Sequence, residues 1–160
     1  MFAPRATALN RLGEIKKLSG EYVEAAETFN KALVIERIID NQYGIARALN
    51  QLCIVNKNLG NYSESLNQGI ESLEIFEELG KQSNVALGHN TLANVYKQMG
   101  DYDKALVHAE SSLELRIKIG KKKSIAHSYT TVALLYKQIG DYQSSIDILF
   151  KALSIWDDYG

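Results

Sequence analysis

The chain contains 160 residues, of which 46% are hydrophobic and 23% charged, and its formal net charge is −1. This composition excludes intrinsic disorder, and the near-neutral charge argues against a nucleic-acid-binding protein and against charge-driven attachment to an anionic membrane. The chain has a single proline, which leaves long stretches free to form helices. We therefore expect an all-α protein with no nucleic-acid partner.

Two further features bear on localisation. The one cysteine, Cys53, cannot form an internal disulfide, so nothing requires an oxidising compartment. Residues 1–17 include Arg5, Arg11 and Glu14 and lack the apolar run of a signal peptide or a membrane span. We expect a cytoplasmic protein with no membrane partner.

Glycine recurs along the chain at a fixed interval of forty residues. The first set, in which each glycine is followed by a polar residue and a tyrosine, is Gly20, Gly60, Gly100 and Gly140. A second set lies halfway between these positions, at Asp40, Gly80, Gly120 and Gly160. Glycine in the left-handed conformation commonly ends a helix. The spacing predicts two helices in each of four repeats, residues 1–40, 41–80, 81–120 and 121–160, within one domain.

Polar residues at the junctions predict where the helices begin. Asn61, Asp101 and Asp141 directly follow glycines and are typical N-cap residues. At the longer junctions we expect Ser83 and Ser124 to be the N-caps.

Apolar and small residues within the predicted helices recur at steps of three and four, which is typical of one buried helical face. In the first helix of each repeat they include Ala6, Ala46, Ala86 and Ala126, and in the second helix Leu33, Leu73, Leu113 and Leu153. The pattern indicates helices that approach closely through small residues.

These motifs resemble the tetratricopeptide repeat across all 160 residues. The best match combines a first-helix segment with the glycine turn and second helix that follow: Leu92, Ala93, Tyr96, Gly100, Asp101, Tyr102 and Ala105. The forty-residue period and the lack of a proline at repeat ends are similar to the class found in kinesin light chains, cell-polarity adaptors and bacterial sensors and regulators. The resemblance implies an α-solenoid of four antiparallel helix hairpins in a right-handed superhelix.

The sequence offers little material for catalysis. We interpret His89, His108 and His127 as unrelated histidines, and Cys53 as a small packing residue. We interpret the basic run at residues 121–123, with Arg116 and Lys118 before it, as a solvated loop. We expect no enzymatic activity, no cofactor and no metal site.

The resemblance implies that the first helix of each repeat lines a concave groove. Opposite the core face, these helices carry a row of asparagines, continued by a threonine, and a row of lysines. The predicted groove residues are Asn10, Asn50, Asn90, Thr130, Lys17, Lys57, Lys97, Lys137, Arg47, Asn94 and His127. Carboxamides can bind a peptide backbone, and lysines favour acidic ligands. We expect a non-enzymatic module that binds an extended peptide or partner helix, with acidic partners preferred.

The last predicted helix is apolar, and no capping helix follows to cover it. Either the natural protein continues beyond residue 160, which we favour, or two copies pack together through Leu149, Leu153 and Trp156 as a homodimer. Two alternative functions stay open. One is the sensory or regulatory input domain of a bacterial signalling protein, and the other is a structural spacer or self-assembly module.

Overall fold

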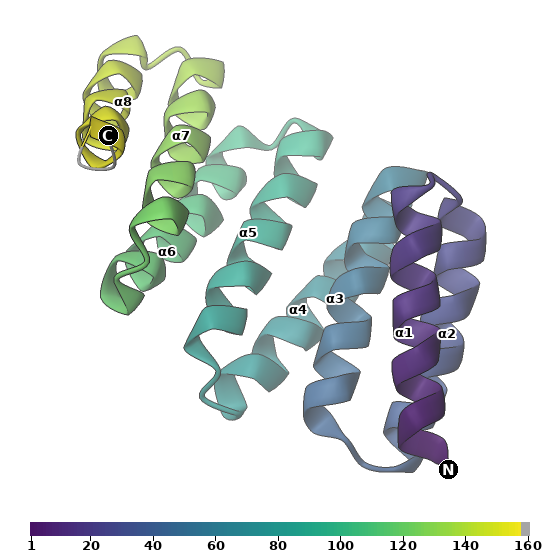
Figure 1. Cartoon of the computed structure of the whole chain (residues 1–160). Coiled ribbons are helices and arrows are strands. Elements are labelled where there is room, and N and C mark those ends of the chain that lie inside the picture. Colours follow the sequence, from purple (N-terminus) through teal and green to yellow (C-terminus); the bar gives the residue numbers. More distant parts are fainter. Residues whose placement is uncertain (158–160) are drawn as a thin grey trace. The chain divides into compact units, whose positions relative to one another are not determined.

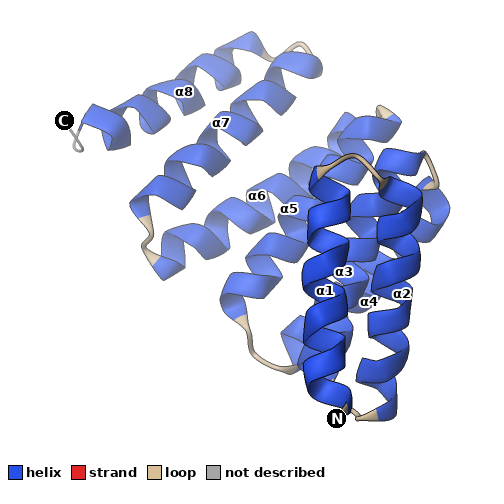
Figure 2. Ribbon diagram, turned by 45° about the vertical axis from the view of Figure 1, so that its right-hand side comes forward, coloured by secondary structure: helices blue, strands red, loops and turns tan. Residues whose placement is uncertain are grey.

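A computed structural model describes residues 1–157, which form eight α-helices and no strand (Figures 1 and 2). The helices are α1 (Phe2–Leu18), α2 (Tyr22–Ile38), α3 (Gln42–Leu59), α4 (Tyr62–Glu78), α5 (Gln82–Met99), α6 (Tyr102–Ile119), α7 (Lys122–Gln138) and α8 (Tyr142–Asp157). They pair as four consecutive hairpins, so the predicted all-α fold of helix-hairpin repeats is confirmed.

The predicted helix ends are confirmed where the structure describes them. Glycines with positive φ stand at six junctions, Gly20, Gly60, Gly80, Gly100, Gly120 and Gly140, and Asp40 adopts a φ of 52° at the remaining one. Gly160 lies outside the described residues.

The predicted N-caps are confirmed only in part. The side chains of Asp101 and Asp141 accept hydrogen bonds from the backbone N–H groups three residues ahead, whereas Asn61 makes no such bond. Ser83 and Ser124 were wrong as caps. They lie inside α5 and α7, because these helices begin at Gln82 and Lys122 and the preceding turns are shorter than expected.

The chain forms two compact units, of which the first is residues 1–81. In this unit α1 packs on α2, α2 on α3 and α3 on α4. The core between α2 and α3 is built around Phe29, which is fully buried, together with Leu33, Leu49, Leu52 and Val55. The apolar faces predicted from the sequence therefore meet in this unit.

The second unit begins at Gln82, and its helices α5 to α8 also pack consecutively. Its core contains Ala109 and Leu113 of α6, which pack against Val132 and Leu135 of α7. These residues stand forty or eighty positions after core residues of the first unit, so the two units repeat one packing scheme.

Buried serines join the two helices of several hairpins. Each hydroxyl donates a 2.7 Å hydrogen bond to a backbone carbonyl of the first helix, as Ser65 does to Cys53, Ser72 to Ala46, Ser112 to Ala86 and Ser145 to Ala133. These serines occupy positions where the repeat pattern usually has alanine. Hydrogen bonding satisfies the hydroxyls that burial would otherwise leave unpaired.

None of the helices within residues 1–157 combines the length and the hydropathy of a membrane span.

Candidate functional site

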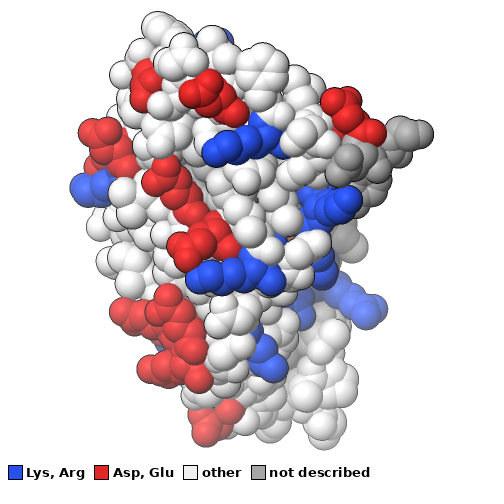
Figure 3. Space-filling view, turned by 90° about the vertical axis from the view of Figure 1, so that its left-hand side faces the viewer, with Lys and Arg blue, Asp and Glu red and all other residues white. Residues whose placement is uncertain are grey.

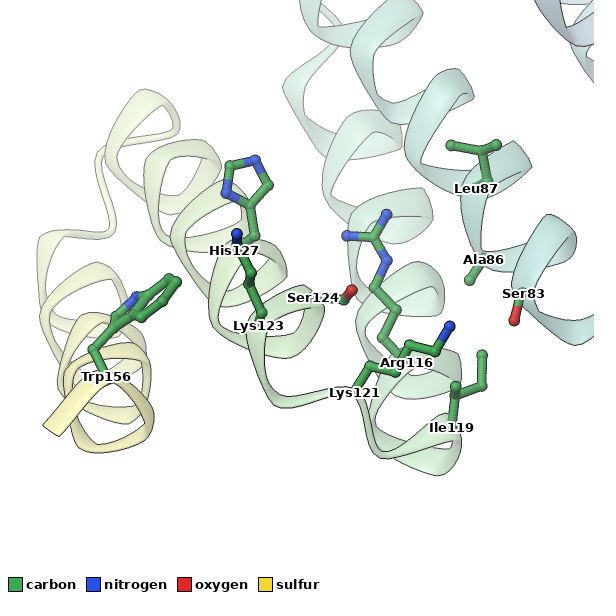
Figure 4. A pocket seen from close by; sticks show the side chains of 10 residues that line it. All are labelled: Ser83, Ala86, Leu87, Arg116, Ile119, Lys121, Lys123, Ser124, His127 and Trp156. Atoms are coloured by element: carbon green, nitrogen blue, oxygen red, sulfur yellow. The ribbon is translucent and has the colours of Figure 1, made fainter. Parts of the chain in front are cut away.

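The second unit contains a cavity of about 560 Å³ to which all four of its helices contribute. Figure 4 shows the side chains around it, with Arg116 extending into the space between the helices that carry Leu87 and His127. The lining residues are Ser83, Ala86, Leu87, Arg116, Ile119, Lys121, Lys123, Ser124, His127 and Trp156.

Arg116 is the cation most enclosed at this cavity. Its guanidinium is half-buried and donates a 2.7 Å hydrogen bond from Nη1 to the hydroxyl of Ser128. No carboxylate of the described residues forms an ion pair with it. Burial lowers the pKa of Arg116 from its usual value, because the surroundings disfavour the charged form. An anion bound beside this guanidinium would restore the lost stabilisation.

Other side chains give the cavity a mixed character. Lys121 and Lys123, both exposed, add positive charge at one side. Leu87, Ile119 and Trp156 provide apolar surface. This combination suits a ligand that places a carboxylate next to an apolar side chain.

The first unit has a smaller cavity of about 290 Å³ between its first three helices. Its charges are balanced, because Arg11 and Arg47 line it together with Glu14 and Glu36. Arg47 forms a 3.7 Å ion pair with Glu14, and the buried Glu36 accepts a 2.8 Å hydrogen bond from Asn41. Arg47 of this cavity therefore has a carboxylate partner within the chain.

The comparison with family models matches three overlapping stretches, residues 4–78, 44–118 and 84–158, to the tetratricopeptide repeat. The chain belongs to the tetratricopeptide repeat family. The resemblance expected from the glycine, tyrosine and alanine spacing is confirmed, and the fold supports a protein-interaction module. A search of curated proteins found no match.

Solved structures of other tetratricopeptide repeat proteins are similar in fold. BtubC (BKLC) from P. vanneervenii has a TM-score of 0.88 and 23% identity over 96% of this chain and 64% of its own. A putative kinesin light chain of Podospora anserina has a TM-score of 0.84 and 16% identity, over 96% of this chain and 76% of its own. A Rap protein complexed with competence and sporulation factor has a TM-score of 0.82 and 17% identity over 99% of this chain and 44% of its own. The chain thus spans less than two thirds of BtubC and under half of that Rap protein.

The structure distributes the predicted groove residues of the first two repeats among different environments. Asn10 and Arg47 line the smaller cavity. Lys17 donates a 2.6 Å hydrogen bond to the side-chain oxygen of Gln51, and burial lowers the pKa of this lysine. Lys57 is half-buried. Asn50 differs from the open position we expected, because only 4% of it is exposed and its Oδ1 has no partner among the described residues.

In the last two repeats, His127 is the predicted groove residue that reaches the larger cavity. Asn94 donates a 2.9 Å hydrogen bond to the backbone carbonyl of Asn90, and Thr130 donates to the carbonyl of Ala126. Lys97 and Lys137 are exposed. Neither cavity is lined by the other five predicted groove residues of these repeats, which are Asn90, Asn94, Lys97, Thr130 and Lys137.

Sequence reasoning missed the most informative cations. We interpreted Arg116 and the lysines of residues 121–123 as a solvated loop, yet Arg116, Lys121 and Lys123 line the larger cavity. At the forty-residue period, Arg116 corresponds to Glu36, Phe76 and Trp156, so charged and aromatic residues alternate at this position. The repeat pattern therefore gave no signal that singles out Arg116.

Two of the three histidines are in contact, which corrects the interpretation of unrelated histidines. The Nδ1 atoms of His89 and His108 lie 3.0 Å apart, and the ring of Tyr96 stacks on His108. Among the described residues, no three His, Cys, Asp or Glu side chains gather in a metal-binding group.

Cys53 is buried, and its Sγ lies 3.4 Å from the hydroxyl of Ser65. Burial raises the pKa of this thiol, which suppresses the reactive thiolate. The surroundings of Cys53 are those of a packing residue.

Proposed function

We propose that this chain is a non-enzymatic interaction module that binds an acidic extended peptide or partner helix along the first helices of its repeats. The observation that carries this proposal is the cavity of the second unit, where a half-buried guanidinium lacks a carboxylate partner among the described residues. The fold supports the same class of function.

Arg116 is the proposed receptor for a ligand carboxylate. A guanidinium can donate two parallel hydrogen bonds to a carboxylate, and only its bond to Ser128 is made within the described chain. Ser128 also orients the side chain, because the same hydroxyl donates to the backbone carbonyl of Ser124 in α7. Lys121 and Lys123 would attract the approaching ligand through longer-range charge.

The apolar part of the lining supplies a second recognition element. Leu87 and Trp156 lie on different helices of the cavity and can contact an apolar side chain next to the bound carboxylate. Tryptophan and arginine are frequent among the residues that dominate binding energies. We therefore expect peptides with alternating acidic and apolar residues to bind best.

The half-buried Asn10 and Asn90, one in each unit, are the proposed contacts to the peptide backbone. An amide side chain both donates and accepts, so it can bind a peptide backbone regardless of sequence. In this role Asn10 would act from the smaller cavity, and Asn90 from the same helix as Leu87.

Trp156 is the single tryptophan of the chain, which makes its fluorescence a direct probe of the cavity. We would titrate the protein with a peptide of alternating glutamate and leucine, and separately with one of alternating lysine and leucine. A saturable change with the glutamate peptide alone, which weakens as ionic strength rises from about 0.05 M to about 0.5 M, is the expected result. An equal response to both peptides, or none to the glutamate peptide, would contradict the proposal.

A second candidate function is the input domain of a bacterial signalling protein. The similarity in fold to RapI, with a TM-score of 0.87, and to a Rap protein complexed with competence and sporulation factor favours it. Peptide binding would then control an attached output domain. The gene that encodes this chain separates the two candidates. An output domain in the same reading frame would favour the signalling role, and its absence would favour an interaction module that acts alone.

A further inference from the structure

The outer faces of α1 and α8 carry the two residue patterns that meet in a contact made twice within the chain, between α2 and α3 and between α6 and α7. In each unit, the second helix of one hairpin packs its apolar face against the first helix of the next, as α2 does on α3 and α6 on α7. The helix α8 is a second helix, and α1 is a first helix, so each presents one half of this contact.

The repeat period identifies the exposed residues of α8 that correspond to buried ones. Leu33 and Leu113 pack against α3 and α7 and are 7% and 8% exposed, whereas Leu153, at the corresponding position, is 53% exposed. Ile146 is likewise exposed, although Leu106 forty residues earlier is partly buried against the α6–α7 core. Apolar surface of this kind marks an interaction site when it is contiguous.

The same comparison identifies the matching face of α1. Leu12 corresponds to Leu52 and Val132, which are almost fully buried against the preceding helix, yet Leu12 is 45% exposed. Ile15 corresponds to the buried Val55 and Leu135, yet it is 61% exposed. Leu12 and Ile15 therefore occupy the positions that, in α3 and α7, pack against the preceding helices α2 and α6.

Charge also favours a contact between these two helices. Besides Glu14, α1 carries four cations, Arg5, Arg11, Lys16 and Lys17, whereas the charged residues of α8 are Asp147, Lys151 and Asp157. Figure 3 shows that charged side chains of both signs lie at the surface on one face of the molecule. Opposite net charges on the helices add a modest attraction to the apolar contact.

We propose that α8 of one copy packs against α1 of a second copy, so that the chain assembles head to tail. The contact would continue the packing established between α2 and α3 and between α6 and α7. Because the two faces differ, the interface is heterologous and leaves one free face at each end of the assembly. Such a contact allows assemblies larger than a dimer. Two α8 helices packed against each other would instead form only a symmetric dimer. Arg116 lies on α6, outside both proposed faces, whereas Trp156 of the cavity lies on α8, three residues after Leu153.

Two substitutions block one face each: Leu153→Glu on α8 and Ile15→Glu on α1. Both residues are exposed in the single copy, so we expect each variant to fold, and circular dichroism checks this. Ile146→Glu provides a second variant of the α8 face. Val107→Glu, at an exposed position on α6 outside both faces, is the matched control.

Sedimentation velocity over a range of concentrations provides the test. We expect the mean mass of the wild type and of Val107→Glu to rise with concentration beyond two 17.9-kDa chains, and each blocked variant to be monomeric. An equimolar mixture of Leu153→Glu and Ile15→Glu should form a dimer and nothing larger, since one intact face of each kind remains. A wild-type monomer at all concentrations, a limit at the dimer, or a mixture that stays monomeric would overturn the proposal.

Discussion

The Nδ1 atoms of His89 and His108 lie 3.0 Å apart across the contact between α5 and α6. At this distance one ring donates and the other accepts, so the arrangement requires an unprotonated acceptor nitrogen. Burial lowers the pKa of both histidines, and the charge of His89 adds to the effect at His108. Tyr96 stacks on His108, and the ammonium of Lys104 lies 5.5 Å from the centre of that tyrosine ring. The site therefore favours the neutral pair.

This pair predicts that stability decreases in mild acid. The native pKa values lie below the ordinary 6.5, so below that pH the unfolded chain binds more protons than the folded chain. Their contribution is complete above about pH 6.5 and is lost as the pH falls towards the native values. Thermal unfolding followed by circular dichroism should show a falling Tm below that pH. The double variant His89→Gln with His108→Gln should show a flatter profile, and equal slopes for both proteins would contradict the assignment.

At Gly13, we predict that alanine destabilises the protein although it has the higher helix propensity. Alanine is favoured over glycine in a helix by about 1 kcal/mol. A Cβ at Gly13, however, would lie 2.7 Å from Cε1 of Phe29, whose ring is fully buried. We expect Gly13→Ala to destabilise the protein by about 1–3 kcal/mol in urea unfolding, through overpacking. In a Phe29→Leu background the loss should disappear, and a loss of the same size there would exclude the steric explanation.

We predict that replacing Asn50 with an apolar residue stabilises the protein. The buried Oδ1 of Asn50 has no hydrogen-bond partner among the described residues, and such an acceptor costs about 1–3 kcal/mol. Asn50→Leu, which has a similar volume, should therefore raise the free energy of unfolding. Asn90→Leu, at the corresponding half-buried position, should have a smaller effect. Destabilisation by Asn50→Leu would show that the amide is satisfied in the folded protein.

The regular part of the fold follows from periodicity. The glycine spacing placed the helix junctions, and the small residues marked the helix contacts, because both depend on local chain geometry. Comparing successive repeats also shows that a smaller residue on one helix of a hairpin is matched by a larger one on the other. Gly13 faces the large Phe29, whereas one repeat later the larger Cys53 takes the position of Gly13 and Gly69 that of Phe29.

The site was less predictable, because it depends on side chains brought together from separate helices. The rule that placed the asparagine row treated every repeat alike, yet Asn50 is buried while Asn10 lines a cavity. Three cations outside the predicted row line the cavity near the end of α6 and the start of α7: Arg116, Lys121 and Lys123. Helical periodicity alone contains no information about such neighbours.

The most direct test of peptide binding compares two cations on α6. Arg116→Gln removes the charge at the cavity, and Lys118→Gln removes an exposed charge that pairs with Glu114 at 2.7 Å and does not line the cavity. The affinity for the glutamate–leucine peptide, measured by isothermal titration calorimetry on monomeric protein, should fall about tenfold or more in Arg116→Gln, as expected for loss of a hydrogen bond between charged groups. It should stay within about twofold of the wild type in Lys118→Gln, whose charge is screened by solvent. Equal affinities for wild type and Arg116→Gln would contradict the account.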